Sequence, residues 1–307
     1  MNYLIRDYQR GDETAITRLF EETFGKPMTP EQWRWKYRIA IGKPYAKLAV
    51  TPSGTIVGCV GAIPLRGIMA QQPLPFFQIV DVMVHADHRG HLGSRNLFLR
   101  LITRLLEAIG SEFGEVLAYG FPGQRSFPLA ERAGVYGRIT RARDYTVAAQ
   151  DHGFSLLRIQ PLDWHDPRLN ALWQRRSRQF GLALVRDADY LHWRYAESPF
   201  YTYRLFGLFC FTRLLGWAVT RDDGEQILLI DLLVGKSLCA QALRAFSGYF
   251  ERAGKHRLRL WLPDGWAPDY PATESEIVVT NMVWKLPLAT RFVQENLFYT
   301  LGDTDVF

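Results

Sequence analysis

Residues 76–94 of this 307-residue chain, FFQIVDVMVHADHRGHLGS, decide how the rest of the sequence is interpreted. The run Phe76–Val84 is too continuously apolar for the edge of a sheet, so it predicts a central strand. From Leu97 onward, apolar side chains recur at helical spacing until Gly110, where we expect the helix to end. The segment therefore predicts a buried strand, a turn that contains glycine, and an amphipathic helix.

The turn between this strand and this helix is the first candidate for chemistry. Backbone N–H groups at the beginning of a helix, beside glycines that let a ligand approach closely, form a cradle for an anion. Arg89 adds a positive charge next to Gly90, and a pyrophosphate would fit such a cradle. The alternative is a plain connection between a strand and a helix.

The elements around the turn follow a regular order. Thr29, with Pro30 after it and Gln32 three residues later, is a typical N-cap and predicts the beginning of a helix. The other elements expected in the first half are strands at 3–8, 47–50, 55–63, 115–121 and 136–147, a helix after residue 12 and a short helix that ends near residue 133.

The turn and the order of elements resemble one known family. Residues 81–94 resemble the acyl-CoA-binding motif of the GNAT (Gcn5-related N-acetyltransferase) superfamily, in which a central strand passes through an Arg/Gln-x-x-Gly-x-Gly/Ala loop into a helix. The order of elements is similar to that family's over about half of the chain. The resemblance implies the fold class α/β (α+β), with a mixed, mostly antiparallel, splayed sheet flanked by helices.

The resemblance also implies a site for acetyl-CoA or another acyl-CoA as co-substrate. The backbone of Val82, Met83 and Val84 would pair with the pantetheine arm, and the loop would hold the pyrophosphate. The loop residues that the motif implies are Arg89, Gly90, His91, Leu92, Gly93, Ser94 and Arg95. Because Leu92 stands where the motif has its central glycine, either the loop is shifted by one residue or it binds phosphate less tightly.

Two residues are candidates for proton transfer. In GNAT enzymes a strand carboxylate, or water held by one, often takes the amine proton, and Asp81 occupies a matching place; the alternative is a solvated or salt-bridged strand residue. The tyrosine that usually serves as general acid would fall near Ala130 and is missing. Tyr119, on the strand before it, could protonate the leaving thiolate instead, or it is an aromatic residue of the core.

Three histidines in the segment suggest a metal, but their context does not. His85, His88 and His91 are spaced by three, and only a helix would bring that spacing onto one face. Because this segment is expected to be a strand end and a loop, we expect no metal.

The second half of the sequence repeats the first. WRWKY at 33–37 recurs as HWRY at 192–195, and each copy is expected at the end of a helix that leads into a strand. Strands are predicted again at 203–209, 214–220, 226–234 and 257–262, with a helix before the last. An internal duplication accounts for this order, and chance recurrence of helix ends rich in Trp and Tyr is the alternative.

We therefore predict two GNAT-like domains. Residues 1–150 would bind acyl-CoA, and residues 151–307 would form a degenerate copy that shapes the acceptor site. The second copy has Gly235-Lys236-Ser237 in place of the Arg-x-x-Gly signature. Asp303, Asp305 and the terminal carboxylate could supply a base or bind an ammonium group between the domains, or they belong to a final strand with a solvated turn.

Composition limits the class of protein and of partner. With 48% hydrophobic and 22% charged residues, the chain can form a packed core and is not disordered. Its net charge of +6 favours an acidic partner such as a phosphorylated co-substrate, or else gives a basic surface without a specific partner. No run of five or six basic residues marks a nucleic-acid-binding tail.

Cysteine spacing and hydropathy indicate the compartment. Cys59, Cys210 and Cys239 lie far apart in apolar segments, so we expect buried thiols in a reducing compartment. The sequence opens on an alternating strand instead of a leader, and no apolar stretch reaches the ~18 residues that span a bilayer. The expected location is the cytoplasm.

Together these features predict an N-acyltransferase that moves an acyl group from acyl-CoA to a primary amine of a small-molecule acceptor by direct attack. Amides of the strand Val82–Val84 would stabilise the oxyanion. An acyl carrier protein, which the arginines at 89, 95, 100 and 104 could meet, and aminoacyl-tRNA are alternative donors. A non-catalytic GNAT-like ligand-binding protein is a further alternative, suggested by Leu92 and the missing tyrosine.

Overall fold

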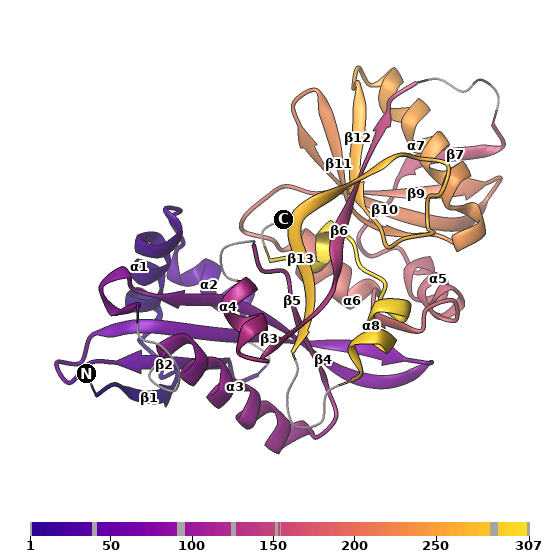
Figure 1. Cartoon of the computed structure of the whole chain (residues 1–307). Coiled ribbons are helices and arrows are strands. Elements are labelled where there is room, and N and C mark those ends of the chain that lie inside the picture. The colour runs from indigo at the N-terminus through magenta and orange to yellow at the C-terminus, as the bar shows by residue number, and fades with distance from the viewer. Residues whose placement is uncertain are drawn as a thin grey trace. The chain divides into compact units, whose positions relative to one another are not determined.

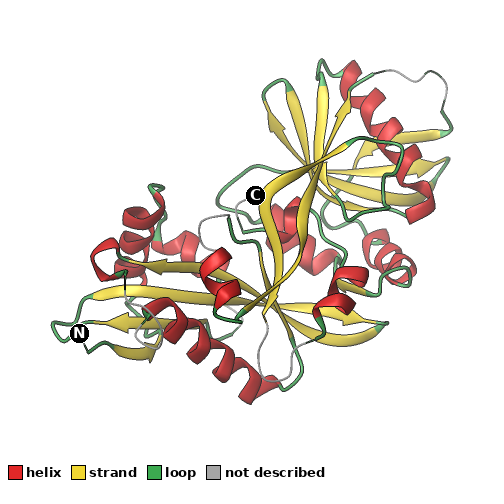
Figure 2. Ribbon diagram, viewed as in Figure 1, coloured by secondary structure: helices red, strands yellow, loops and turns green. Residues whose placement is uncertain are grey.

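The chain has a mixed α/β fold in which helices flank β-sheet (Figure 1, Figure 2). The computed structural model describes residues 2–38, 42–90, 96–123, 127–150, 153, 155–282 and 288–305. Contacts divide the chain into two compact units that interleave along the sequence. Unit 1 comprises Met1–Arg66, Leu74–Ile139 and Thr280–Thr290, and unit 2 comprises Gly67–Pro73, Thr140–Val279 and Arg291–Phe307.

The sheet of unit 1 has the strand order β1-β2-β3-β4-β5-β13. These strands are β1 (Leu4–Asp7), β2 (Tyr45–Val50), β3 (Ile56–Met69), β4 (Gln72–Val84), β5 (Leu117–Gly120) and β13 (Ala272–Met282), of which only the end from Thr280 belongs to unit 1. β4 and β5 run parallel, whereas the β1–β2, β2–β3 and β5–β13 pairs are antiparallel. The predicted central strand is confirmed, because β4 lies between β3 and β5 and is buried from Phe76 to Asp81.

The strand beside β5 comes from a distant part of the sequence. The sequence predicts a strand at 136–147 as the last element of the first half. It exists as β6 (Tyr136–Ala148), but its residues 144–148 pair with β12 (Arg257–Trp261) in unit 2. In unit 1 the neighbour of β5 is β13, where Thr280 pairs with Gly120 and donates from its hydroxyl to the Gly120 carbonyl at 3.2 Å.

Five helical segments belong to unit 1: α1 (Glu13–Phe24), α2 (Pro30–Lys36), η1 (Ala86–His88), α3 (Leu97–Phe113) and α4 (Phe127–Arg132), counted within the described residues. α2 begins as predicted with a capping box. The Gln32 amide donates to the Thr29 hydroxyl at 3.2 Å, and the Gln32 side chain accepts from the Thr29 amide at 2.8 Å. This cap fixes where the helix begins and therefore which residues stand at its other end.

α3 covers the sheet with the apolar face that its spacing predicted, but it ends later. Its buried side chains are Leu97, Leu101, Ile102, Leu105, Leu106 and Ile109. The predicted end at Gly110 is wrong, because Gly110 is helical and the helix continues to Phe113. Gly114, with φ of +71°, ends the helix, since a positive φ is costly for any residue with a β-carbon.

The sheet of unit 2 has the strand order β7-β9-β10-β11-β12-β6. Its strands besides β6 and β12 are β7 (Leu157–Pro161), β9 (Arg204–Cys210), β10 (Arg213–Asp223) and β11 (Gln226–Leu233), and the short β8 (Leu182–Leu184) pairs with Gly67–Met69. β11 and β12 run parallel, whereas the β7–β9, β9–β10, β10–β11 and β12–β6 pairs are antiparallel. Unit 2 therefore has the same order of strands and the same parallel pair as unit 1.

As in unit 1, helical segments of unit 2 precede the second strand of its sheet and follow the first strand of its parallel pair. The helical segments of unit 2 are α5 (Arg168–Ser177), α6 (Ala188–Leu191), the π-helical turn η3 (His192–Ala196), η4 (Lys236–Leu238), α7 (Cys239–Arg252), α8 (Thr290–Asn296) and η5 (Leu301–Asp303). None of the helices within the described residues is long and apolar enough to cross a membrane.

Cys59 and Cys239 are buried, Cys210 is partly exposed, and all three thiols are free.

One glycine makes room for a buried tyrosine of unit 1. A β-carbon at Gly61 of β3 would lie 1.8 Å from the Tyr37 hydroxyl. Tyr37 cannot move aside easily, because its ring stacks on Trp33 at 4.3 Å between centroids. We expect Gly61→Ala to lower the free energy of unfolding by about 1–3 kcal/mol.

Denaturant unfolding measures this effect. Gly42→Ala is the matched control, because no heavy atom lies within 4 Å of a β-carbon at Gly42. Equal stability of Gly61→Ala and Gly42→Ala would contradict the packing described for Tyr37.

Candidate functional site

Strand β4 runs on past its pairing with β5. Within the described residues, the parallel register joins Phe76, Phe77 and Gln78 to Leu117–Tyr119, and β4 continues to Val84. Met83 is buried, whereas Val82 and Val84 are half-buried. The last residues of β4 thus have one side chain in the core and two that reach toward the surface.

The turn after β4 presents a guanidinium and an open stretch of backbone. Arg89 follows η1, its side chain is exposed, and its Nε donates to the Val84 carbonyl at 2.7 Å. Gly90 has φ of +94°, and no heavy atom lies within 4 Å of where its β-carbon would be. These features fit an anion that approaches the backbone closely. The other predicted loop residues, His91, Leu92, Gly93, Ser94 and Arg95, lie outside the described residues.

Two of the three histidines in the turn lie together. The rings of His85 and His88 are 5.8 Å apart between centroids, and the Tyr3 hydroxyl is hydrogen-bonded to His88 Nδ1 at 2.9 Å. Within the described part of the chain, no three His, Cys, Asp or Glu side chains form a group that could hold a metal ion.

Asp81 is buried in the middle of unit 1, and both of its carboxylate oxygens are hydrogen-bonded. Lys36 Nζ lies 2.6 Å from Oδ1, and the Tyr37 hydroxyl donates to Oδ2 at 2.8 Å. The side chains of Asp81 and Lys36 are only 1% and 6% exposed. The backbone of Asp81 is left-handed, with φ of +50°, in the middle of β4. The role of Asp81 as a general base stays a prediction.

Tyr119, the predicted acid, is a buried residue of β5. It is 2% exposed, and its ring contacts Phe76 and Phe121 edge to face, each at 5.8 Å between centroids. Its neighbour across the sheet is Asn281 of β13. Its role as acid also stays a prediction.

The Cys59 thiol is not activated as a nucleophile. Burial raises its pKa well above the ordinary value, and the negative charge of Asp81 adds to this effect. The thiol therefore stays protonated near neutral pH, and only a thiolate attacks efficiently.

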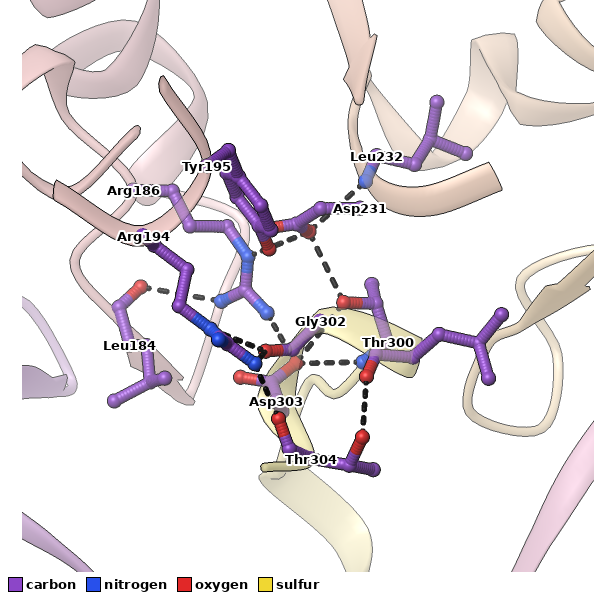
Figure 3. Close-up of polar contacts among 11 residues, drawn as sticks. Leu184, Arg186, Arg194, Tyr195, Asp231, Leu232, Thr300, Gly302, Asp303 and Thr304 are labelled. Atoms are coloured by element: carbon purple, nitrogen blue, oxygen red, sulfur yellow. Dashed lines mark hydrogen bonds and ion pairs between the residues drawn. The ribbon is translucent and has the colours of Figure 1, made fainter. Parts of the chain in front are cut away.

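Unit 2 contains a second buried carboxylate, which reading the sequence missed. Asp231 of β11 is fully buried and accepts from the Tyr195 hydroxyl at 2.9 Å and from Arg186 Nε at 3.0 Å (Figure 3). Thr300 donates to it from its hydroxyl at 3.0 Å. A signal was present, because the DLLV at 231–234 matches the DVMV at 81–84 in position after an apolar run.

Arg186 also binds the segment that contains η5. Arg186 Nη2 also pairs with the Asp303 carboxylate, and the Arg194 guanidinium donates to the carbonyls of Gly302 and Thr304 (Figure 3). Burial raises the pKa of Asp303 to about 6, although the Arg186 guanidinium acts in the opposite direction. Asp303 is thus buried and paired, unlike the solvated turn that was one expectation for this segment.

The family model of the acetyltransferase (GNAT) domain matches residues 4–139. The chain carries a GNAT domain. Its β4, the turn at Arg89 and Gly90, and α3 all lie within the matched residues. The resemblance seen in the sequence is therefore confirmed for this part of the chain.

Solved structures share the fold of most of this chain. A conserved protein from Enterococcus faecalis V583, described as a probable N-acyltransferase, has a TM-score of 0.72 at 13% identity and covers 92% of this chain and 73% of its own. GCN5-related N-acetyltransferases from Anabaena variabilis ATCC 29413 and Kribbella flavida each have a TM-score of 0.69 at 14% identity, cover 92% of this chain, and are covered over 72% and 70% of their own lengths. At this identity the likeness shows the fold alone. A search of the curated proteins finds no match.

The raised pKa of Asp303 predicts how stability changes with pH. The unfolded chain binds this proton only below about pH 4, whereas the native state binds it below about pH 6. Asp303 therefore contributes stability that is fully present below pH 4 and is lost as the pH rises through 6. Relative to Asp303→Asn, which cannot ionise, the wild-type protein should gain on the order of 2–3 kcal/mol between pH 7 and pH 4.

Urea unfolding at pH 4, 5, 6 and 7 measures this difference. Asp269→Asn removes an exposed carboxylate and serves as the control. The quantity compared is the free energy of unfolding of the wild-type protein minus that of Asp303→Asn. If this difference stays constant or decreases toward pH 4, burial does not raise the pKa of Asp303.

Proposed function

We propose that this protein is an N-acyltransferase that transfers an acyl group from acyl-CoA to a primary amine. The observation that carries the proposal is the continuation of β4 into the exposed Arg89 and the open backbone of Gly90, followed by α3, inside a GNAT domain. The backbone and the guanidinium suit a phosphorylated donor, and the half-buried Val82 and Val84 flank a path along β4 for its apolar arm.

The reaction proceeds by direct attack. The amine nitrogen gives up a proton to a carboxylate or to water and attacks the thioester carbonyl carbon. A C–N bond forms, the C–S bond breaks, and the CoA thiolate takes up a proton and leaves as the thiol. Backbone N–H groups of Val82–Val84 would stabilise the oxyanion. No thiol competes as a nucleophile in this region, since burial keeps Cys59 protonated.

Calorimetric titration with acetyl-CoA tests the donor. We expect saturable binding, and release of free thiol when a panel of primary amines is added. Arg89→Ala should weaken acetyl-CoA binding about tenfold or more, because a charge-assisted contact with phosphate contributes on the order of 1.5–3 kcal/mol.

Arg18→Ala is the control, because Arg18 is an exposed arginine of α1 that pairs only with Glu22 among the described residues. No heat at millimolar acetyl-CoA would reject the CoA donor and leave a carrier-protein or aminoacyl-tRNA donor to be tested. Binding without turnover on any amine would favour the ligand-binding alternative.

A further inference from the structure

Each unit has a buried aspartate at the same place in its central strand. Asp81 follows Phe77 by four residues, and Asp231 follows Ile227 by four. Phe77 pairs with Ala118 across the parallel β4–β5 register, and Ile227 pairs with Leu258 across the parallel β11–β12 register. Residues with apolar side chains follow each aspartate to the end of its strand, Val82–Val84 in β4 and Leu232 and Leu233 in β11.

The two aspartates have the same kinds of partner. The Tyr37 hydroxyl donates to Asp81 at 2.8 Å, and the Tyr195 hydroxyl donates to Asp231 at 2.9 Å. Each tyrosine stands at the end of the helical segment that precedes the first long strands of its unit. The other carboxylate oxygen meets a cation in both units, Lys36 in unit 1 and Arg186 in unit 2.

Each aspartate also stands at an irregularity of its strand. Asp81 has φ of +50°. In unit 2 the register between β10 and β11 shifts at this point, because Val219 pairs with Asp231 but the next residue, Thr220, pairs with Leu229. An extra residue of this kind is a β-bulge, which bends a strand and redirects the residues after it.

The two surroundings differ in what chemistry they allow. Only unit 1 has the exposed Arg89 and the open Gly90 after its central strand. In unit 2, Thr300 and Asp303 of the η5 segment cover Asp231, so no substrate reaches that carboxylate. An arrangement that is kept where a substrate cannot enter has a task other than proton transfer.

From this repetition we infer that Asp81 is a positioning residue, which ties the end of α2 to the left-handed backbone of β4 at Asp81 and so sets the direction of Val82–Val84. The part of the inference that concerns the acyl donor rests on the proposed function, whereas the anchoring of α2 does not. The proton of the amine then goes to another acceptor, such as water. In unit 2 the same device also holds the segment that contains η5.

The energetics of buried ion pairs separate this role from that of a base. Removing one member of a buried pair leaves the other charge without compensation and is strongly destabilising, whereas replacing both members by neutral groups is often close to neutral. A positioning pair can therefore be rescued by the second substitution. A general base cannot be rescued in this way, because its proton acceptor is gone.

The experiment compares Asp81→Asn, Lys36→Met and the double variant. We expect each single substitution to lower the unfolding temperature and weaken acetyl-CoA binding, and the double variant to recover most of both. Turnover of the double variant with the best amine should stay within about tenfold of wild type, with the same pH dependence of kcat/KM. Loss of a general base would instead lower turnover about 10²–10⁴-fold. It would also remove the limb of the pH profile of kcat/KM that reports the titration of that base.

Conservative variants keep the test decisive if the double variant fails to fold. Tyr37→Phe removes only the hydroxyl that reaches Asp81, and it should weaken acetyl-CoA binding while the pH profile stays unchanged. Tyr195→Phe is the matched variant in unit 2, and it should lower the unfolding temperature by a similar amount without changing acetyl-CoA affinity.

Two results would overturn the inference. One is a double variant that is as stable as wild type and binds acetyl-CoA normally but turns over more than 100-fold slower. The other is a double variant whose loss of stability equals the sum of the losses in the two single variants. That result would show that Asp81 and Lys36 do not act as a pair. If acetyl-CoA does not bind even to the wild-type protein, the proposed function fails, and the unfolding temperatures alone still test the anchoring pair.

Discussion

A charge inside a sheet has to be paired, and this constraint organises both units. Removing a carboxylate from water costs several kcal/mol, so Asp81 and Asp231 persist only because a cation and a tyrosine hydroxyl meet each of them. The choice of cation has further effects. Lysine is a compact charge, and Lys36 pairs with Asp81, whereas the fork of Arg186 also reaches a second carboxylate and so ties Asp303 to the same place.

The site of the GNAT domain depends on a short series of local interactions. The capping box at Thr29 and Gln32 fixes the beginning of α2, and the length of the helix then puts Lys36 and Tyr37 at its end. Those two side chains hold Asp81, where the backbone of β4 is left-handed, and the residues after it lead to the turn at Arg89 and Gly90. The steps along α2 and along β4 are local in sequence, whereas the contacts of Lys36 and Tyr37 with Asp81 join residues 45 and 44 positions apart. A small change at the cap can therefore alter the backbone of β4.

Much of the first unit could be predicted from the sequence, because periodicity and capping are local signals. The α2 cap, the central strand and the buried face of α3 were read correctly. The end of α3 was not, since Gly110 and Gly114 look alike in sequence and only the backbone φ distinguishes them. The pairing of β5 with β13 joins residues 160 positions apart, from Gly120 to Thr280, and no local pattern specifies it.

The candidate site was predicted only in part, for the same reason. Residue type and spacing indicate the turn at Arg89. The burial of Asp81 and its two partners, in contrast, depends on how α2 packs on β4. Asp231 was overlooked because it sits in an apolar strand with no glycine signature after it. The repeat WRWKY and HWRY was visible, but only the structure shows that its tyrosines reach a carboxylate in each unit.

The origin of β13 bears on how the protein folds during synthesis. When the ribosome has produced the first half of the chain, β5 has its parallel neighbour β4 but not the strand that covers its other edge. That edge stays open until residues near 280 have emerged, and an open strand edge invites pairing with other chains. Contacts of such high sequence separation also slow folding, so the unit that begins first waits for residues that follow most of the other unit in the sequence.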